Sequence, residues 1–275
     1  MHLKTKNKIL WIYSLFLFLP LFSTYSQPQS ISWQKVDSGL FFTETLSPIK
    51  SDNGDSKVTI LKIDPHYYSF KLLSAKETKE DNKTIREWVK TKELIAAINA
   101  GLYQEDDKTN VGFMKNYNFV NNNHLTKDNT VTAFNRTDAT VPEIQIIDLK
   151  CQKWEDLKDK YYSFTQGIRM IDCNQNNTWS QQPDKFGMAV IAIDKQGNAL
   201  FIFTCSPYSV HDFINSLKLL PLDIYNAMYL EGSSPASFYL NYKGLEDEKT
   251  GYIMANGENG TAWELPNIIG IVKKK

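Results

Sequence analysis

The sequence predicts an α/β (α+β) domain in which helices flank a mixed β-sheet, and three consecutive segments support this prediction. Met188–Ile193 and Ala199–Thr204 are apolar runs joined by a short polar turn, which is typical of an antiparallel hairpin. A helix is expected next, because Ser209 begins a capping signature and apolar residues then recur at helical spacing as far as Pro221. Ala227–Leu230 is a further apolar run, so the order strand, helix, strand predicts a parallel crossover.

The composition is that of one globular domain. The chain has 275 residues, of which 42% are hydrophobic and 13% aromatic, enough for a sizeable core. Basic and acidic residues number 31 each, so no net field favours nucleic acid, and no nucleic-acid partner is expected. We expect a single domain over residues 27–275, with its motifs concentrated in residues 94–272.

The N-terminus has the pattern of a signal peptide over residues 1–26. Lys4, Lys6 and Lys8 form a positive segment, and an apolar run over residues 9–22 follows it. This run is shorter than the roughly 20 residues that a membrane-spanning helix needs; an uncleaved N-terminal anchor is the alternative. We therefore expect export to a periplasmic or secreted location of a bacterial envelope, without stable membrane insertion after signal cleavage.

The segment before residue 94 is expected to form strands and one short helix. Leu40–Phe42 is predicted to be an entry strand. Val58–Ile63 and Tyr67–Ala75 are rich in β-forming residues on either side of a turn, which predicts a hairpin. Thr84 and Glu87 have the spacing of a capping box, so a helix should follow from Ile85 to about Lys90.

The apolar run Leu94–Ile98 fits a strand buried on both faces or the interior of a helix, and its shortness favours the strand. The Asn-rich stretch 116–129 is expected to be a loop. The remaining predictions before residue 188 are strands over Val111–Met114, Val131–Phe134 and Ile144–Leu149, and a helix over Lys153–Lys158.

Two of these predicted strands end in residues that suit a ligand site. Asn99-Ala100-Gly101 follows the predicted strand Leu94–Ile98, and Glu231-Gly232-Ser233-Ser234 follows the predicted strand Ala227–Leu230. Small residues let backbone N–H groups approach a ligand closely. A carboxylate directly after a buried strand is costly unless it is paired or used. The alternative is a surface turn with a solvated glutamate.

Several blocks of the chain, in this order, resemble the phosphodiester glycosidase family. Tyr229–Ser234 is similar to the family loop Asn-Leu-Asp-Gly-Gly-Gly-Ser-Ser, and Ser206–Phe213 resembles a bacterial subgroup. The other similar blocks are Ala96–Tyr103, Val111–Phe113, Thr165–Asp172 and Met188–Asp194. The resemblance runs from about Leu94 to the C-terminus.

The resemblance implies hydrolysis of a sugar-1-phosphodiester to a free sugar and a phosphomonoester. Glu231 would be the carboxylate near the anomeric carbon, as base, nucleophile or stabiliser of positive charge. Asn99 would bind a sugar hydroxyl or orient Glu231, although a capping role for Asn99 is equally open. The expected substrate-binding residues are Gly101, Arg169, Gly232, Ser233, Ser234 and His211. The sequence specifies no cofactor. A divalent cation with Glu231 and Asn99 as oxygen ligands is an open alternative.

The chain departs from the family pattern at three places, one of which is Ser233-Ser234-Pro235, where the bacterial subgroup has Gly-Pro-Glu. Glu231 stands where the common loop has Asp, and Cys205 stands where the bacterial subgroup has Arg. Losing an Arg removes a bidentate anion ligand, so a catalytically inactive glycan-binding surface or periplasmic protein is the alternative function. Cys151 and Cys173 are the other two cysteines, so at most one disulfide can form, with the pairing left open.

Overall fold

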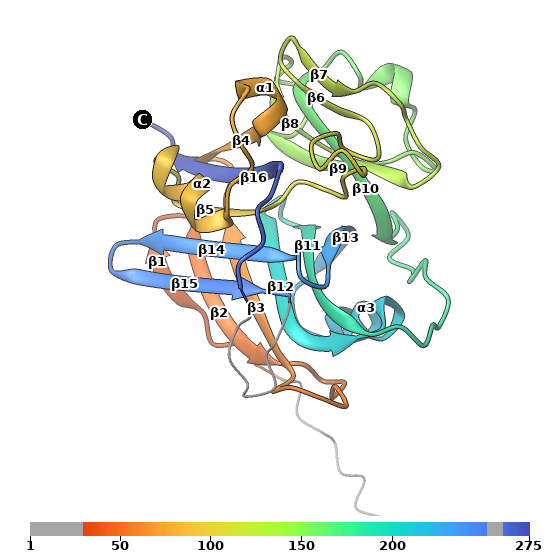
Figure 1. Ribbon diagram of the computed structural model, residues 1–275. Helices are drawn as coiled ribbons and strands as arrows, with labels where there is room; N and C mark the ends of the chain where they lie inside the picture. The colour runs from red at the N-terminus through yellow and green to blue at the C-terminus, as the bar shows by residue number, and fades with distance from the viewer. Residues whose placement is uncertain (1–29, 252–260) are drawn as a thin grey trace, which may run out of the picture.

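A computed structural model describes residues 30–251 and 261–275, and the predicted signal peptide over residues 1–26 lies outside this range. The chain forms two antiparallel sheets that face each other (Figure 1). The described residues include three short α-helices: α1 (Ala75–Thr78), α2 (Ile85–Thr91) and α3 (Val210–Leu219). The protein is therefore mostly β.

The larger sheet has 11 strands in the order β1-β2-β3-β12-β11-β13-β10-β6-β7, and β8 joins β10 to β9. Strands β6 to β9 form a lobe at the upper right of Figure 1. The bounds are β1 (Gln34–Asp37), β2 (Leu40–Leu46), β3 (Lys57–Ile63), β6 (Met114–Asn116), β7 (Phe119–Asn122), β8 (Asn129–Arg136), β9 (Ile144–Asp148), β10 (Tyr161–Ile171), β11 (Phe186–Asp194), β12 (Ala199–Tyr208) and β13 (Ile224–Gly232).

The smaller sheet has five strands in the order β15-β14-β5-β16-β4. Its central strand β5 lies between two strands from the C-terminal part of the chain, β14 and β16. The bounds are β4 (Tyr68–Ser74), β5 (Ala96–Asn99), β14 (Ser237–Tyr242), β15 (Leu245–Thr250) and β16 (Asn267–Lys273).

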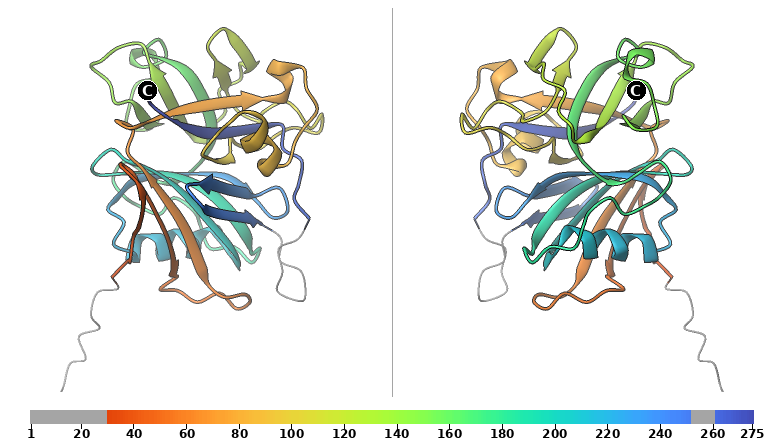
Figure 2. Two further views of the ribbon diagram at one scale, coloured as in Figure 1. Left: turned by 90° about the vertical axis from the view of Figure 1, so that its left-hand side faces the viewer. Right: turned by 90° about the vertical axis from the view of Figure 1, so that its right-hand side faces the viewer.

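The main hydrophobic core lies between the two sheets. Phe201, Phe203 and Leu230 of the large sheet pack in the same buried cluster as Ile98 and Phe238 of the small sheet. The other face of the large sheet packs against α3, and α2 packs on the outer face of the small sheet. The two side views of Figure 2 show the facing sheets, with α3 outside the large sheet. Both sheets are thus buried on two faces.

The predicted α/β class with a mixed sheet is wrong. Every strand pairing among the described residues is antiparallel, and most elements are strands. Strands β12 and β13 do run in the same direction around α3, but β11 lies between them and pairs antiparallel with both. Two adjacent parallel strands need a crossover connection. The reverse does not hold, because a third strand can lie between the two strands that a crossover joins, as β11 does here.

Three local predictions also fail. Strands β3 and β4 do not form a hairpin, because β3 pairs with β2 and β12 while β4 pairs with β16 in the other sheet. The stretch predicted as a loop over 116–129 contains β7, which pairs with β6. The helix predicted over Lys153–Lys158 is a single 3-10 turn, η1 (Trp154–Asp156).

Where the sequence carries a strong local signal, the prediction is confirmed. Strands β11 and β12 form the expected hairpin. Ser209 caps α3 by accepting a hydrogen bond from the Asp212 amide. Thr84 and Glu87 form the expected capping box at α2. No helix in the described part of the chain is long and apolar enough to cross a membrane.

Candidate active site at the end of strand β13

Glu231 lies near the end of β13, where that strand extends past one of its neighbours. The ladder with β10 ends at Tyr229, whereas the ladder with β11 continues to Gly232. The Glu231 residue is only 7% exposed. Its carboxylate Oε1 accepts a hydrogen bond of 3.0 Å from the backbone amide of Gly232.

The surroundings of Glu231 favour the protonated form of its side chain. Burial raises the pKa of Glu231 from its ordinary value of 4.5 to about 7, and only the hydrogen bond from the Gly232 amide opposes this. No charged side chain of the described residues contributes to the shift. Burial, and then the charge of Glu231, raise the pKa of Tyr103 to about 12 and also raise the pKa of Tyr229. A carboxyl group with a pKa near 7 suits proton transfer.

Asn99 joins the two strand ends that the sequence singled out. It ends β5 in the small sheet, and its side chain is buried. Its amide Nδ2 donates to the Pro235 carbonyl at 2.9 Å, and its Oδ1 accepts from the Ser237 amide at 2.7 Å. Asn99 therefore holds the chain that leaves Glu231, and both of its polar atoms already bond to that chain.

The backbone amides after Glu231 are mostly occupied. The Gly232 amide donates to the Glu231 carboxylate, and the Ser233 amide donates to the Gly187 carbonyl at 2.9 Å. Ser233 has a φ of 57°, and its carbonyl accepts from the Ala236 amide to close a turn. An anion placed here would depend on the Ser234 amide and on the hydroxyl groups of Ser233 and Ser234.

Gly101 allows close packing between the end of β5 and strand β10. Its φ is 143°, and a Cβ atom at this position would lie 2.9 Å from Asn110 Oδ1 and 3.1 Å from the Gln166 carbonyl. The Thr165 hydroxyl on β10 donates to the neighbouring Ala100 carbonyl. The structure therefore gives Gly101 a packing role next to the site.

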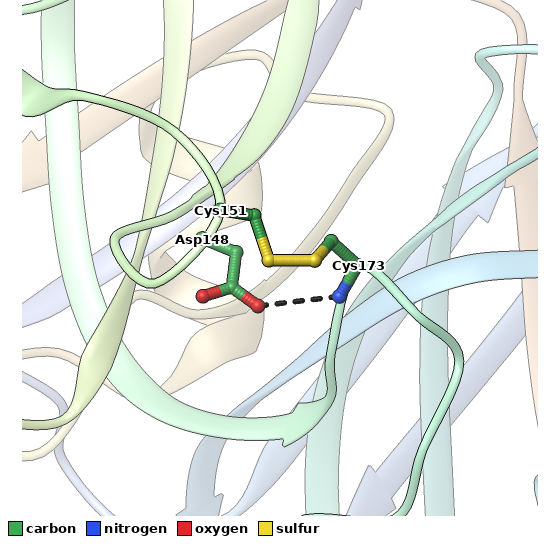
Figure 3. Close-up of side chains that lie close together, drawn as sticks. All are labelled: Asp148, Cys151 and Cys173. Carbon is green, nitrogen blue, oxygen red and sulfur yellow. Dashed lines mark hydrogen bonds between the residues drawn. A yellow bond between two sulfur atoms is a disulfide. The ribbon is translucent and has the colours of Figure 1, made fainter.

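Arg169 is bound to a buried carboxylate that the sequence analysis had not singled out. Its Nη1 donates to Asp148 Oδ1 at 3.1 Å, and the Asp148 side chain is fully buried. Cys151 and Cys173 form a disulfide beside this pair, and the Cys173 amide donates to Asp148 Oδ2 at 3.2 Å (Figure 3). The guanidinium of Arg169 is thus engaged in an internal ion pair.

His211 lies on α3 and connects to the site through an aromatic side chain. Its Nδ1 lies 2.9 Å from the Trp179 carbonyl oxygen. The indole of Trp179 contacts the ring of Tyr229 with a centroid distance of 5.9 Å. His211 therefore supports Trp179, and through it the strand that carries Glu231.

The sequence analysis missed the aromatic residues around Glu231. Tyr229 is buried between Trp179 and Phe186, whose ring centroid lies 6.3 Å from that of Tyr229. Tyr103 follows β5 and has a side-chain hydrogen bond with Trp263. One signal was present, because Tyr229 stands where the similar family loop has Asn. Aromatic rings beside a carboxylate provide the apolar faces against which sugar rings can pack.

A comparison with known families agrees with the sequence motifs. The profile of the phosphodiester glycosidase family matches residues 92–272, about two thirds of the 275 residues. This chain belongs to the phosphodiester glycosidase family. No curated protein matches its sequence.

Two solved structures share the fold of this chain at low sequence identity. The zebrafish N-acetylglucosamine-1-phosphodiester alpha-N-acetylglucosaminidase catalytic domain is 13% identical with a TM-score of 0.65, covering 89% of this chain and 88% of that one. A hypothetical protein from Synechocystis is 14% identical with a TM-score of 0.61, covering 90% and 64%. At such identities, these likenesses establish the common fold.

The described residues offer no convincing ligand set for a metal ion. The pair proposed from the sequence is Glu231 and Asn99, but Asn99 Oδ1 already accepts the Ser237 amide. Asp148, Cys151 and Cys173 also lie close together, yet both sulfur atoms are in the disulfide (Figure 3). Thiolates, which are the metal-binding form of cysteine, are therefore not present there.

Proposed function

We propose that this phosphodiester glycosidase hydrolyses the bond between the anomeric carbon of a sugar and a phosphodiester, with Glu231 as the general base. The observation that carries the proposal is the buried Glu231 carboxyl group, whose pKa burial raises to about 7. A general base is most effective when its pKa lies near the working pH. Membership of the family supports the reaction class.

The chemistry of the leaving group favours a base over an acid. A phosphomonoester has a second pKa of about 6, so it leaves with little protonation. Water attacks the anomeric carbon, Glu231 accepts one proton of that water, and the bond from carbon to the phosphate oxygen breaks. The second proton of the water stays on the new sugar hydroxyl, and Glu231 returns its proton to solvent or to the phosphate.

The phosphate would lie against the turn after Glu231. Among the described residues, the Ser234 amide and the hydroxyls of Ser233 and Ser234 are the donors of this turn that have no acceptor, so they would bind the anion. Cys205 replaces the Arg of the bacterial subgroup, and burial raises the pKa of this thiol to about 12, so it brings no positive charge. This weaker anion site favours a diester, which carries one negative charge, over a phosphomonoester with two.

Export is part of the proposal. The N-terminal 26 residues have the composition of a signal peptide. The Cys151–Cys173 disulfide supports the same conclusion, because structural disulfides persist mainly in oxidising compartments. The substrate is then a glycan or envelope polymer that carries sugar-1-phosphodiesters.

The direct test is hydrolysis of a panel of sugar-1-phosphate methyl diesters, followed by phosphorus NMR, in water enriched in oxygen-18. The proposal expects the label in the sugar and a phosphomonoester product, with kcat/KM rising as pH increases through about 7. Glu231→Gln should lower kcat by about 10²- to 10⁴-fold. The matched control Glu246→Gln, at an exposed strand of the small sheet, should keep full activity. Label in the phosphate, or full activity in Glu231→Gln, contradicts the proposal.

The alternative is a glycan-binding protein without turnover. It is favoured by the engagement of Arg169 with Asp148 and by the occupied amides of Gly232 and Ser233. Binding of the same diesters without any product, in wild type and in Glu231→Gln alike, would support this alternative.

A further inference from the structure

The side chain of Tyr229 covers the backbone that binds the Glu231 carboxylate. A Cβ atom at Gly232 would collide with the Tyr229 hydroxyl oxygen, and it would also lie 2.7 Å from Phe186 Cδ2. The Tyr229 hydroxyl therefore occupies the space that a side chain at position 232 would need. The Gly232 amide is the group that donates to Glu231 Oε1. The phenol and the carboxylate thus converge on one glycine.

The Tyr229 ring is fixed from two sides by partly exposed aromatic residues. Trp179 lies 5.9 Å from it between ring centroids, and Phe186 lies 6.3 Å from it in an edge-on arrangement. Trp179 is itself held, because its Nε1 donates to the Arg169 carbonyl at 2.7 Å. Tyr229 is only 6% exposed as a result. Its ring is a buried apolar wall next to the backbone of Gly232.

We propose that Tyr229 is a positioning residue that fixes the Glu231 carboxyl group and shields it from bulk solvent, apart from the one water that reacts. The inference deepens the proposed function, since it rests on Glu231 as the base. Burial raises the pKa of Tyr229 and the charge of Glu231 adds to this, as expected for a phenol near a carboxylate. A smaller residue at position 229 would admit water and make Glu231 a weaker base.

The other titratable groups of the described residues near Tyr229 do not cover the Glu231 region in this way. Tyr103, from the chain after β5, is also coupled to Glu231, but it is partly exposed. On the α3 side, His211 bonds to the Trp179 carbonyl. On the β10 side, Arg169 is paired with Asp148. On the β11 side, Lys185 is paired with Asp52.

The test is a carbon-13 NMR titration of the Glu231 carboxyl group, assigned by its loss in Glu231→Gln. Wild type should titrate near pH 7. In Tyr229→Ala the midpoint should fall by about one pH unit or more toward the ordinary Glu value. Tyr229→Phe keeps the ring and should stay within about 0.3 pH unit of wild type. Tyr239→Ala removes a fully buried tyrosine of the small sheet and should leave the midpoint unchanged.

Tyr229→Asn, which introduces the residue of the similar family loop, is the second variant if Tyr229→Ala does not fold, and it should shift the midpoint in the same direction. In an active enzyme the rise of kcat/KM should move to lower pH by the same amount. A folded Tyr229→Ala or Tyr229→Asn protein with the wild-type midpoint overturns the inference. A shifted midpoint in a protein without any turnover supports Tyr229 as a positioning residue and rejects the proposed reaction, so the two failures are distinguishable.

Discussion

Two buried carboxylates in the large sheet have opposite environments. Asp148, at the end of β9, accepts hydrogen bonds from Arg169 and from the Lys150 and Cys173 amides. Glu231, at the end of β13, accepts one hydrogen bond and has no cation among the described residues that acts on it. Both carboxyl groups are removed from water, but Asp148 has a cation and two amides in place of the water, whereas Glu231 has a single amide.

The two carboxylates therefore differ in the partners that are available to their ionised forms. A buried charge with an ion pair and several donors is stable in its ionised form, whereas a buried carboxyl group with one donor keeps its proton up to a higher pH. Strongly perturbed carboxyl groups concentrate at functional sites. The unpaired environment of Glu231 agrees with the proton-transfer role proposed for it, and the following experiments test the difference between the two carboxylates.

The largest effect on stability is expected for Asp148→Ala. The variant removes a fully buried carboxylate and leaves the partly buried Arg169 without its partner, so the free energy of unfolding should fall by about 3 kcal/mol. Urea unfolding at pH 7 measures this. Asp156→Ala, an exposed position in η1, is the control and should change the free energy by less than about 0.5 kcal/mol. If Asp148→Ala and Asp156→Ala lowered the free energy of unfolding equally, Asp148 would contribute no more to stability than an exposed carboxylate.

Removing the disulfide beside Asp148 should have the next largest effect. The Cys151→Ser, Cys173→Ser double variant opens a link with a sequence separation of 22 residues. The free energy of unfolding should fall by about 2–4 kcal/mol, because the unfolded chain gains freedom. Dithiothreitol should destabilise wild type to the same level and leave the double variant unchanged. Wild type with identical stability in both redox states would contradict this.

Glu231→Gln should remove a loss of stability that wild type suffers as pH rises. A carboxylate stabilised by an ion pair would have the opposite effect, because its stabilising contribution is present at high pH. Since the pKa of Glu231 is raised from 4.5 to about 7 in the folded state, the folded protein binds this proton more tightly, and wild-type stability falls as pH rises across this range. The penalty is complete above pH 7 and amounts to about 3 kcal/mol at about 1.4 kcal/mol per pKa unit. Urea unfolding measures this at pH 5 and pH 8.5. The free energy of unfolding of Glu231→Gln, relative to that of wild type, should be higher at pH 8.5 than at pH 5. A constant difference between the two proteins would mean that Glu231 has an ordinary pKa.

The smallest of these effects is expected for Asn99→Ala. The variant removes two hydrogen bonds to the chain after Glu231, so it should cost about 2 kcal/mol in unfolding free energy. Asn118→Ala, at an exposed position between β6 and β7, is the control and should have little effect. If Asn99 holds the Glu231 region, Asn99→Ala should also lower the midpoint of the Glu231 titration. An unchanged midpoint would restrict Asn99 to stability.

Local patterns in the sequence predicted much of this protein. The β11–β12 hairpin, the caps of α2 and α3 and the buried strand β5 all follow from signals within about ten residues. Glu231 directly after an apolar run was recognisable for the same reason. These features depend on periodicity, capping residues and turns, which act between neighbours along the chain.

The partners of these elements were decided only by the tertiary structure. Strand β5 pairs with strands more than a hundred residues away, β11 separates the two strands that a crossover predicted as neighbours, and Arg169 pairs with Asp148 instead of facing an open site. Tyr229 lies over Gly232 because Trp179 and Phe186, the first residue of β11, pack against its ring. Backbone propensity is a property of neighbouring residues, whereas strand pairing and burial depend on which distant surfaces meet. The position of Glu231 at the end of a buried strand was therefore predictable from the sequence, whereas the packing of distant segments set its burial and its raised pKa.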